Sequence, residues 1–99
     1  MIRMICYDVA KNKPRTELAN QLIYLGFERV QYSVFVGRIS PARWKTAWKE
    51  MQKFFLEKCE KTDRIYSHVI ERDHFRGMGI LGAGMDLDWI LQEVDVWFP

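Results

Sequence analysis

The sequence predicts an α+β fold in which two helices cover one face of an antiparallel sheet. Some segments are apolar or alternate with polar residues, as strands do, whereas others repeat apolar residues at helical spacing. The two kinds of segment alternate along the chain, which favours helices packed on a sheet. The 99 residues are enough for one domain with a single core, and the apolar content of 48% excludes a disordered chain.

The first strand is predicted over residues 2–8, an apolar run that ends at Asp8. A helix follows over about residues 14–25. Pro14 suits its first turn, where a backbone N–H has no helical partner, and Asn12 is placed to cap it. Gly26 is expected to end this helix.

Residues 28–39 are predicted to be extended, because apolar and polar side chains alternate there. Twelve residues are many for one strand, so we expect a bulge or a reversal within 31–37. Ser40-Pro41 then starts a second helix that runs to about residue 58, and a further strand covers residues 63–70. The β-α-β-β-α-β order indicates a ferredoxin-like sandwich over residues 1–70.

Residues 71–99 are predicted to be a glycine-rich connector and a last strand. Four glycines and no helical period make 72–84 a flexible connector, and 86–92 form a short helix. Alternation over 94–98 indicates a strand, which needs a sheet edge to pair with. We expect this strand to be exchanged across a homodimer, because the connector is long enough to reach a second copy.

The net charge of +2 hides an uneven distribution, with +6 over residues 1–49 and −4 over residues 50–99. This pattern excludes a uniformly basic nucleic-acid coat and indicates one basic face beside an acidic segment. Two cysteines cannot form a disulfide framework, and Cys6 is expected to be a buried thiol in a reducing cytoplasm. No apolar stretch is long enough to span a bilayer, so we expect a soluble, cytoplasmic protein without membrane contact.

Asp8 is the main candidate for chemistry, because a carboxylate at the end of an apolar strand is costly without a partner. In one interpretation it caps the turn into the first helix or pairs with Lys11, Lys13 or Arg15. In the other it is a ligand for Mg²⁺, which binds through one or two carboxylates and keeps several waters. One aspartate per chain is a sparse site, but a dimer supplies two.

Basic side chains flank the first helix and the long extended segment. They are Arg15, Arg29, Arg38, Arg43 and Lys45. Guanidinium groups bind phosphate through paired hydrogen bonds, so these residues can hold a nucleic-acid strand by its backbone. An ordinary solvated surface explains the same pattern equally well.

Three stretches of the chain resemble motifs of the CRISPR-associated Cas-two family, the small ferredoxin-fold subunit of the spacer-acquisition machinery. The first is Cys6-Tyr7-Asp8-Val9, followed by Lys13-Pro14-Arg15. The second is the nine-residue run over 29–37, and the third is Asp63-Arg64-Ile65-Tyr66. They keep the order and spacing of the family over residues 1–70.

The resemblance implies a homodimer in which two Asp8 side chains face each other across the two-fold axis. It implies Mg²⁺-dependent hydrolysis of RNA or DNA in some members, and in others a bridge between two dimers of the larger CRISPR integrase subunit. Carried over to this chain, Asp8 is the metal ligand and catalytic residue, and Ser33 and Phe35 shape the site. The resemblance makes Arg15 and Arg29 candidate contacts with the nucleic-acid backbone. By their charge, Lys11, Lys13 and Arg38 are expected nucleic-acid contacts as well.

The chain departs from the family at two positions. Many members have a second acidic residue shortly after the aspartate, where this chain has Ala10-Lys11-Asn12, and many have glutamate in place of Val36. Both departures weaken metal catalysis and leave binding intact. Two alternatives therefore stay open: a non-catalytic DNA-binding scaffold, whose acidic tail docks on the integrase, and a free-standing toxin-like ribonuclease of the virulence-associated protein D kind.

Overall fold

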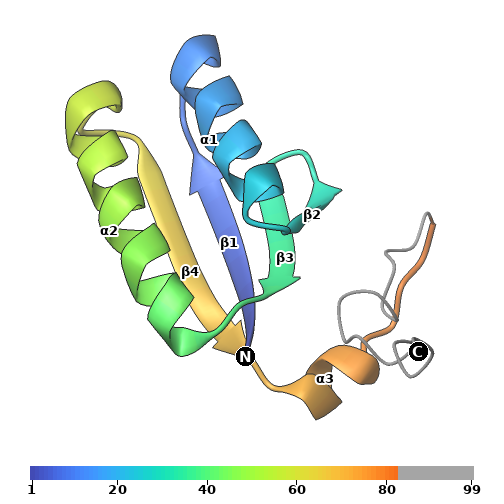
Figure 1. Cartoon of the computed structure of the whole chain (residues 1–99). Helices are drawn as coiled ribbons and strands as arrows, with labels where there is room; N and C mark the ends of the chain where they lie inside the picture. Colours follow the sequence, from blue (N-terminus) through green and yellow to red (C-terminus); the bar gives the residue numbers. More distant parts are fainter. Residues whose placement is uncertain (83–99) are drawn as a thin grey trace.

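The computed structural model describes residues 1–82, in which two long helices and a short third one accompany a four-stranded sheet. The elements are, in order, β1 (Ile2–Asp8), α1 (Asn12–Tyr24), β2 (Glu28–Gln31), β3 (Val34–Arg38), α2 (Pro41–Lys58), β4 (Arg64–Ile70) and α3 (Arg72–Arg76). The sheet has the order β2-β3-β1-β4 with every neighbouring pair antiparallel, and α1 and α2 lie on the same face of it (Figure 1). The predicted ferredoxin-like architecture is confirmed.

The core lies between the helices and the sheet. Ile5 and Tyr7 of β1 and Phe35 of β3 point into it, and each is at most 4% exposed. The helices contribute Leu18, Ala19 and Leu22 from α1 and Trp44, Ala47, Met51 and Phe54 from α2. Because strand side chains alternate between the two faces, the even-numbered residues of β1, including Asp8, point to the other face.

The ends of α2 and the end of α1 follow the sequence signals. The Ser40 hydroxyl accepts a hydrogen bond from the backbone N–H of Arg43 at 3.2 Å, with Pro41 as the first helical residue. After α1, Gly26 adopts φ +92°, and its N–H and that of Phe27 donate to the carbonyls of Ile23 and Leu22. This pair of bonds is the Schellman arrangement, which favours glycine at the left-handed position.

The start of α1 differs from the prediction that Asn12 caps it. The N-cap residue is Lys11, whose side chain makes no capping hydrogen bond, and Asn12 is the first helical residue. The Asn12 Oδ1 atom instead accepts a hydrogen bond from the Arg15 guanidinium. The arginine therefore holds Asn12 inside the first turn, an interaction that the residue types alone do not reveal.

The long extended segment is divided by a two-residue turn at Tyr32-Ser33, between β2 and β3. The reversal lies within the interval predicted for it. Its position carries no Asn-Gly signal, and the pairing of β2 with β3 shifts register between Arg29 and Gln31. A bulge of this kind adds a residue to one strand and increases the local twist.

Within the described residues no helix covers the second face of the sheet, and we call this second face the open face (Figure 1). At the end where β1 begins, Ile2 and Val36 form a small apolar cluster that Met78, beyond α3, helps to cover. Toward the other end the face carries Cys6 and Val34, both half-buried, and Tyr66, which is 52% exposed. The prediction that Cys6 is a buried thiol is therefore wrong within residues 1–82, because its side chain lies on this open face and is only half-buried.

The connector predicted over 72–84 is not without structure, because Arg72–Arg76 form the short helix α3. Arg76 and Asp73, three residues apart on this helix, are joined by an ion pair of 3.3 Å. The predicted helix at 86–92, the strand at 94–98 and its exchange lie outside the described residues. Within residues 1–82 no helix has both the length and the apolar character needed to cross a membrane.

Candidate nucleic-acid and metal site

Asp8 is the last residue of β1 and lies on the open face, directly opposite Arg64 of β4. Its side chain is exposed. Within residues 1–82 the Asp8 carboxylate has no hydrogen-bond or ion-pair partner, so it neither caps α1 nor pairs with Lys11, Lys13 or Arg15. Both oxygens are therefore available to a ligand from outside this part of the chain.

The loop that follows Asp8 is fixed by Asp63, a residue that the sequence did not single out by itself. Asp63 is 8% exposed, and its Oδ1 accepts a hydrogen bond from the Ala10 N–H at 3.0 Å. Its Oδ2 accepts another from the Glu60 N–H at 2.8 Å. Hydrogen bonds to the ionised form, first from Glu60 and then from Ala10, lower the pKa of the Asp63 carboxyl.

Arg15 holds the same loop from the other side. Its Nη1 donates to the carbonyls of Val9 at 3.1 Å and Ala10 at 3.3 Å, while Nη2 donates to Asn12. Buried or half-buried carbonyls at the end of a strand need such donors when the sheet pairing stops. Arg15 is therefore engaged in positioning the loop after Asp8, which is a structural role beside its expected contact with a phosphate backbone.

A second group of side chains lies on the helix-covered face beside the end of β1. The Tyr7 ring stacks on Phe35 with ring centroids 6.1 Å apart, and Phe35 is fully buried. Arg29 donates from Nη2 to the Tyr7 hydroxyl at 3.4 Å. The Ser33 carbonyl accepts from the Tyr7 N–H at 3.1 Å. The structure thus brings Ser33, Phe35 and Arg29 together around Tyr7, the residue before Asp8.

The remaining predicted contacts do not gather at Asp8. Lys11 forms an exposed ion pair with Glu60, with 2.9 Å between Nζ and Oε2, and this pair raises the pKa of the Lys11 amine. Lys13 is exposed on α1. Arg38 pairs with Ile2 across the sheet, at the end of β1 that is far from Asp8. Of the five basic residues, Arg15 and Arg29 are therefore the ones whose contacts connect them with the residues flanking Asp8.

The described residues hold no cluster of three or more His, Cys, Asp and Glu side chains that could bind a metal ion. An unpaired, exposed carboxylate is nevertheless a suitable ligand for Mg²⁺, which keeps most of its waters. A single chain therefore offers one carboxylate for such an ion at this position. Val36, the second position at which the chain departs from the motifs it resembles, is fully buried in the small apolar cluster and contributes no oxygen ligand.

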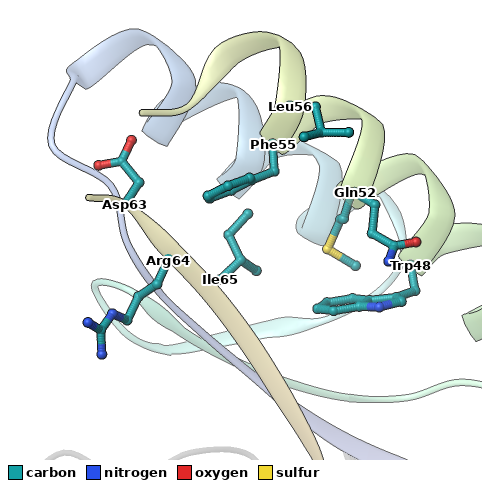
Figure 2. A pocket seen from close by; sticks show the side chains of 8 residues that line it. Trp48, Gln52, Phe55, Leu56, Asp63, Arg64 and Ile65 are labelled. Carbon is teal, nitrogen blue, oxygen red and sulfur yellow. The ribbon is translucent and has the colours of Figure 1, made fainter. Parts of the chain in front are cut away.

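A hollow of about 410 Å³ lies between α2 and β4, and Ile65 in its lining pairs with Tyr7 across the sheet. Figure 2 shows its lining, in which Trp48, Phe55, Leu56 and Ile65 are apolar and Asp63 and Arg64 stand at one end. The carboxylate of Asp63 is occupied by its two backbone hydrogen bonds. The hollow therefore offers apolar surface rather than chemically reactive groups.

Comparison with known proteins identifies the family. The family model described as CRISPR associated protein Cas2 matches residues 1–78. The chain is 31% identical over 83 residues to a protein of Aeropyrum pernix named CRISPR-associated endoribonuclease Cas2, covering 84% of this chain and 87% of the relative.

Shorter matches agree with this result. A Cas2 endoribonuclease of Pyrobaculum aerophilum is 38% identical over 54% of this chain, and one of Methanospirillum hungatei is 48% identical over 40% of it. These matches span 58% and 42% of the relatives' own length.

The fold also resembles the crystal structure of Streptococcus pyogenes Cas2. The TM-score is 0.64 at 24% identity, covering 83% of this chain and 100% of the other. The family-model match includes Asp8, the turn at Tyr32-Ser33 and the Asp63 loop in their observed order. The chain belongs to the CRISPR-associated protein Cas2 family, the Cas-two family that its motifs resemble.

Proposed function

We propose that the chain is a CRISPR-associated endonuclease that works as a homodimer and hydrolyses phosphodiester bonds with Mg²⁺ held between two copies of Asp8. The observation that carries this proposal is the state of Asp8. It is an exposed carboxylate without a partner in residues 1–82, and hydrogen bonds to Asp63 and Arg15 fix the loop behind it. The relatives compared above carry the name endoribonuclease.

The open face supports the dimer. Cys6 and Asp8 are two residues apart on β1 and so share this face, which also carries Val34 and Tyr66. An exposed apolar patch on a protein surface marks a site of contact with another molecule. A second copy related by a two-fold axis would cover it with the same surface and would bring two Asp8 side chains to one interface.

The chain's own residues would bind and orient the substrate strand. Arg29 lies beside the end of β1 and can contact a phosphate, whereas Asp63 and Arg15 hold the backbone next to Asp8 in place. Two carboxylates that approach each other repel, so the pair would need a bound cation or a shared proton. The metal would polarise the phosphodiester and lower the pKa of a bound water.

The deciding experiment compares the wild type with Asp8→Ala on labelled RNA and on duplex DNA, each with Mg²⁺ and with EDTA. We expect Mg²⁺-dependent cleavage by the wild type and none by the variant. Equal cleavage by both proteins would indicate a contaminating nuclease and would exclude Asp8 as the catalytic residue. The exposed Asp8 side chain makes no hydrogen bond or ion pair within residues 1–82, so the variant should fold normally.

A second candidate function is a non-catalytic nucleic-acid bridge between integrase dimers. It is favoured because, among the motif residues within 1–82, Asp8 is the one carboxylate without a hydrogen-bond or ion-pair partner, and because Lys11, which pairs with Glu60, lies in the stretch where the family resemblance implies a second acid. In this case salt-dependent DNA binding would survive Asp8→Ala, because binding rests on phosphate contacts. Truncation after Gly84 removes the acidic end of the chain, and we expect it to abolish binding to the integrase.

A further inference from the structure

Tyr32 occupies an unusual position for a large aromatic residue. It is the first residue of the turn between β2 and β3, and its side chain is 68% exposed. Its backbone carbonyl accepts a hydrogen bond from the Tyr7 hydroxyl at 3.4 Å. Any residue supplies that carbonyl, so the fold of residues 1–82 does not explain why the side chain is a tyrosine.

Two guanidinium groups stand near this ring. The Cζ atom of Arg29 lies 5.2 Å from the ring centroid of Tyr32, and that of Arg15 lies 5.9 Å from it. Both arginines are held by other contacts. Arg15 is bound to the carbonyls of Val9 and Ala10, and Arg29 contacts the Tyr7 hydroxyl and the Phe35 ring. The two cations are therefore fixed in place around a ring that stays largely open to solvent.

This combination differs from the other exposed tyrosines. Tyr24 is 86% exposed and Tyr66 is 52% exposed, and among residues 1–82 neither has a guanidinium over its ring. An exposed aromatic ring bordered by fixed cations suits an unpaired nucleobase, because the base stacks on the ring and the cations attract the adjoining phosphate. Bases in a duplex already stack on one another and are not available in this way.

The turn is also tied to the residue that precedes Asp8. The Tyr7 N–H donates to the Ser33 carbonyl, and the Tyr7 hydroxyl donates to that of Tyr32. Tyr32 lies near arginines of the helix-covered side, whereas Asp8 is on the open face. A nucleic-acid strand with a base on Tyr32 and a neighbouring phosphate at Asp8 would therefore pass over the end of the sheet, from one face to the other.

We propose that Tyr32 is a stacking platform for an unpaired base of the substrate strand, with the guanidinium groups of Arg15 and Arg29 beside its ring to attract the adjoining phosphate. The inference rests on the proposed function for the location of the substrate strand. It does not depend on catalysis, because stacking contributes to binding whether or not the strand is cleaved.

The test measures binding of a labelled single-stranded RNA oligonucleotide and of a duplex of the same sequence, in EDTA so that no cleavage occurs. We expect Tyr32→Ala to weaken single-strand binding by about tenfold, as for the loss of one stacked base, with duplex binding unchanged. Tyr32→Trp should keep the affinity, because a larger ring stacks at least as well. Tyr24→Ala is the matched control and should bind like the wild type.

A series of oligonucleotides with one abasic position each sharpens the result. At the position that meets Tyr32, removing the base should weaken the wild type but not Tyr32→Ala, because the two changes delete the same contact. The proposal is wrong if Tyr32→Ala binds single strands as tightly as the wild type, or if it loses single strands and duplexes equally. Asp8→Ala is measured in the same binding assay. Its cleavage result tests the proposed function, whereas the binding assay, which contains EDTA, tests only the stacking, so the two proposals can fail separately.

Discussion

Asp63 accepts a hydrogen bond from the backbone N–H of Ala10 at 3.0 Å, and so fixes the chain two residues after Asp8. The bond joins residues that are 53 positions apart in the sequence. The second oxygen of Asp63 accepts a hydrogen bond from the Glu60 N–H, so one carboxylate connects the loop after β1 with the turn before β4. Without it, two backbone donors at the edge of the site would lose their acceptor.

We expect Asp63→Asn to lower the melting temperature by about 5 °C at neutral pH, because an amide can replace one of the two acceptor oxygens but not both. Asp8→Asn is the control and should leave the melting temperature unchanged, since the Asp8 carboxylate has no partner in residues 1–82. Thermal unfolding followed by circular dichroism measures both.

The hydrogen-bonded carboxylate of Asp63 also predicts the pH dependence of stability. The pKa of Asp63 is lowered in the folded state, so its contribution is complete above the ordinary aspartate pKa of about 3.9 and is lost as the pH falls through the folded value. The melting temperature of the wild type should therefore approach that of Asp63→Asn as the pH falls below about 4. A difference that stays constant down to pH 2 would show that Asp63 acts through something other than its charge.

Gly37, near the end of β3, predicts a packing effect. A Cβ atom at this position would lie 2.9 Å from the Phe27 ring and 3.0 Å from the Phe27 Cα. Because one of these atoms is backbone, the contact cannot be relieved by a rotamer change, and we expect Gly37→Ala to cost roughly 1–3 kcal/mol. Gly79→Ala has no atom within 4 Å of the new Cβ and should be neutral. Chemical unfolding of the two variants tests this contrast.

The helices were the most predictable part of the fold, because their signals are local. Ser40 and Pro41 mark the start of α2, and Gly26 marks the end of α1, by interactions within a few residues. The turn at Tyr32-Ser33 could not be placed, because these residues carry no turn signal and the bulge beside it depends on pairing between strands. The helix α3 has only five residues, too few for a recognisable apolar period.

The residues of the candidate site that belong to short sequence motifs could be predicted. The hydrogen bonds that hold these residues in place could not. Asp8, Ser33, Phe35 and Arg29 came from short motifs, and the structure places them at one end of the sheet. The role of Asp63 was missed because its partners are backbone N–H groups, which every residue carries. Arg38 was assigned by charge alone, and the antiparallel register of β3 places it at the far end.

The open face predicts a variant that separates the dimer into monomers. Tyr66 is half-exposed on β4 opposite Cys6, so Tyr66→Lys should cost the single chain little but would place charges inside the proposed interface. We expect an apparent mass near that of one 11.9 kDa chain by light scattering. Leu56→Lys, on the exposed side of α2, is the control and should stay dimeric. If Tyr66→Lys is dimeric as well, the open face is not the interface.

The central claim is that two copies of Asp8 form one site, and a subunit-mixing measurement tests it most directly. Wild type and Asp8→Asn are unfolded together in equal amounts, refolded and assayed for Mg²⁺-dependent RNA cleavage. If one site needs both carboxylates, only the dimers of two wild-type chains are active. Random pairing makes these roughly a quarter of the total, so activity should fall to about a quarter of that of the wild type. Activity of about a half would mean that each Asp8 works alone, which contradicts the shared site.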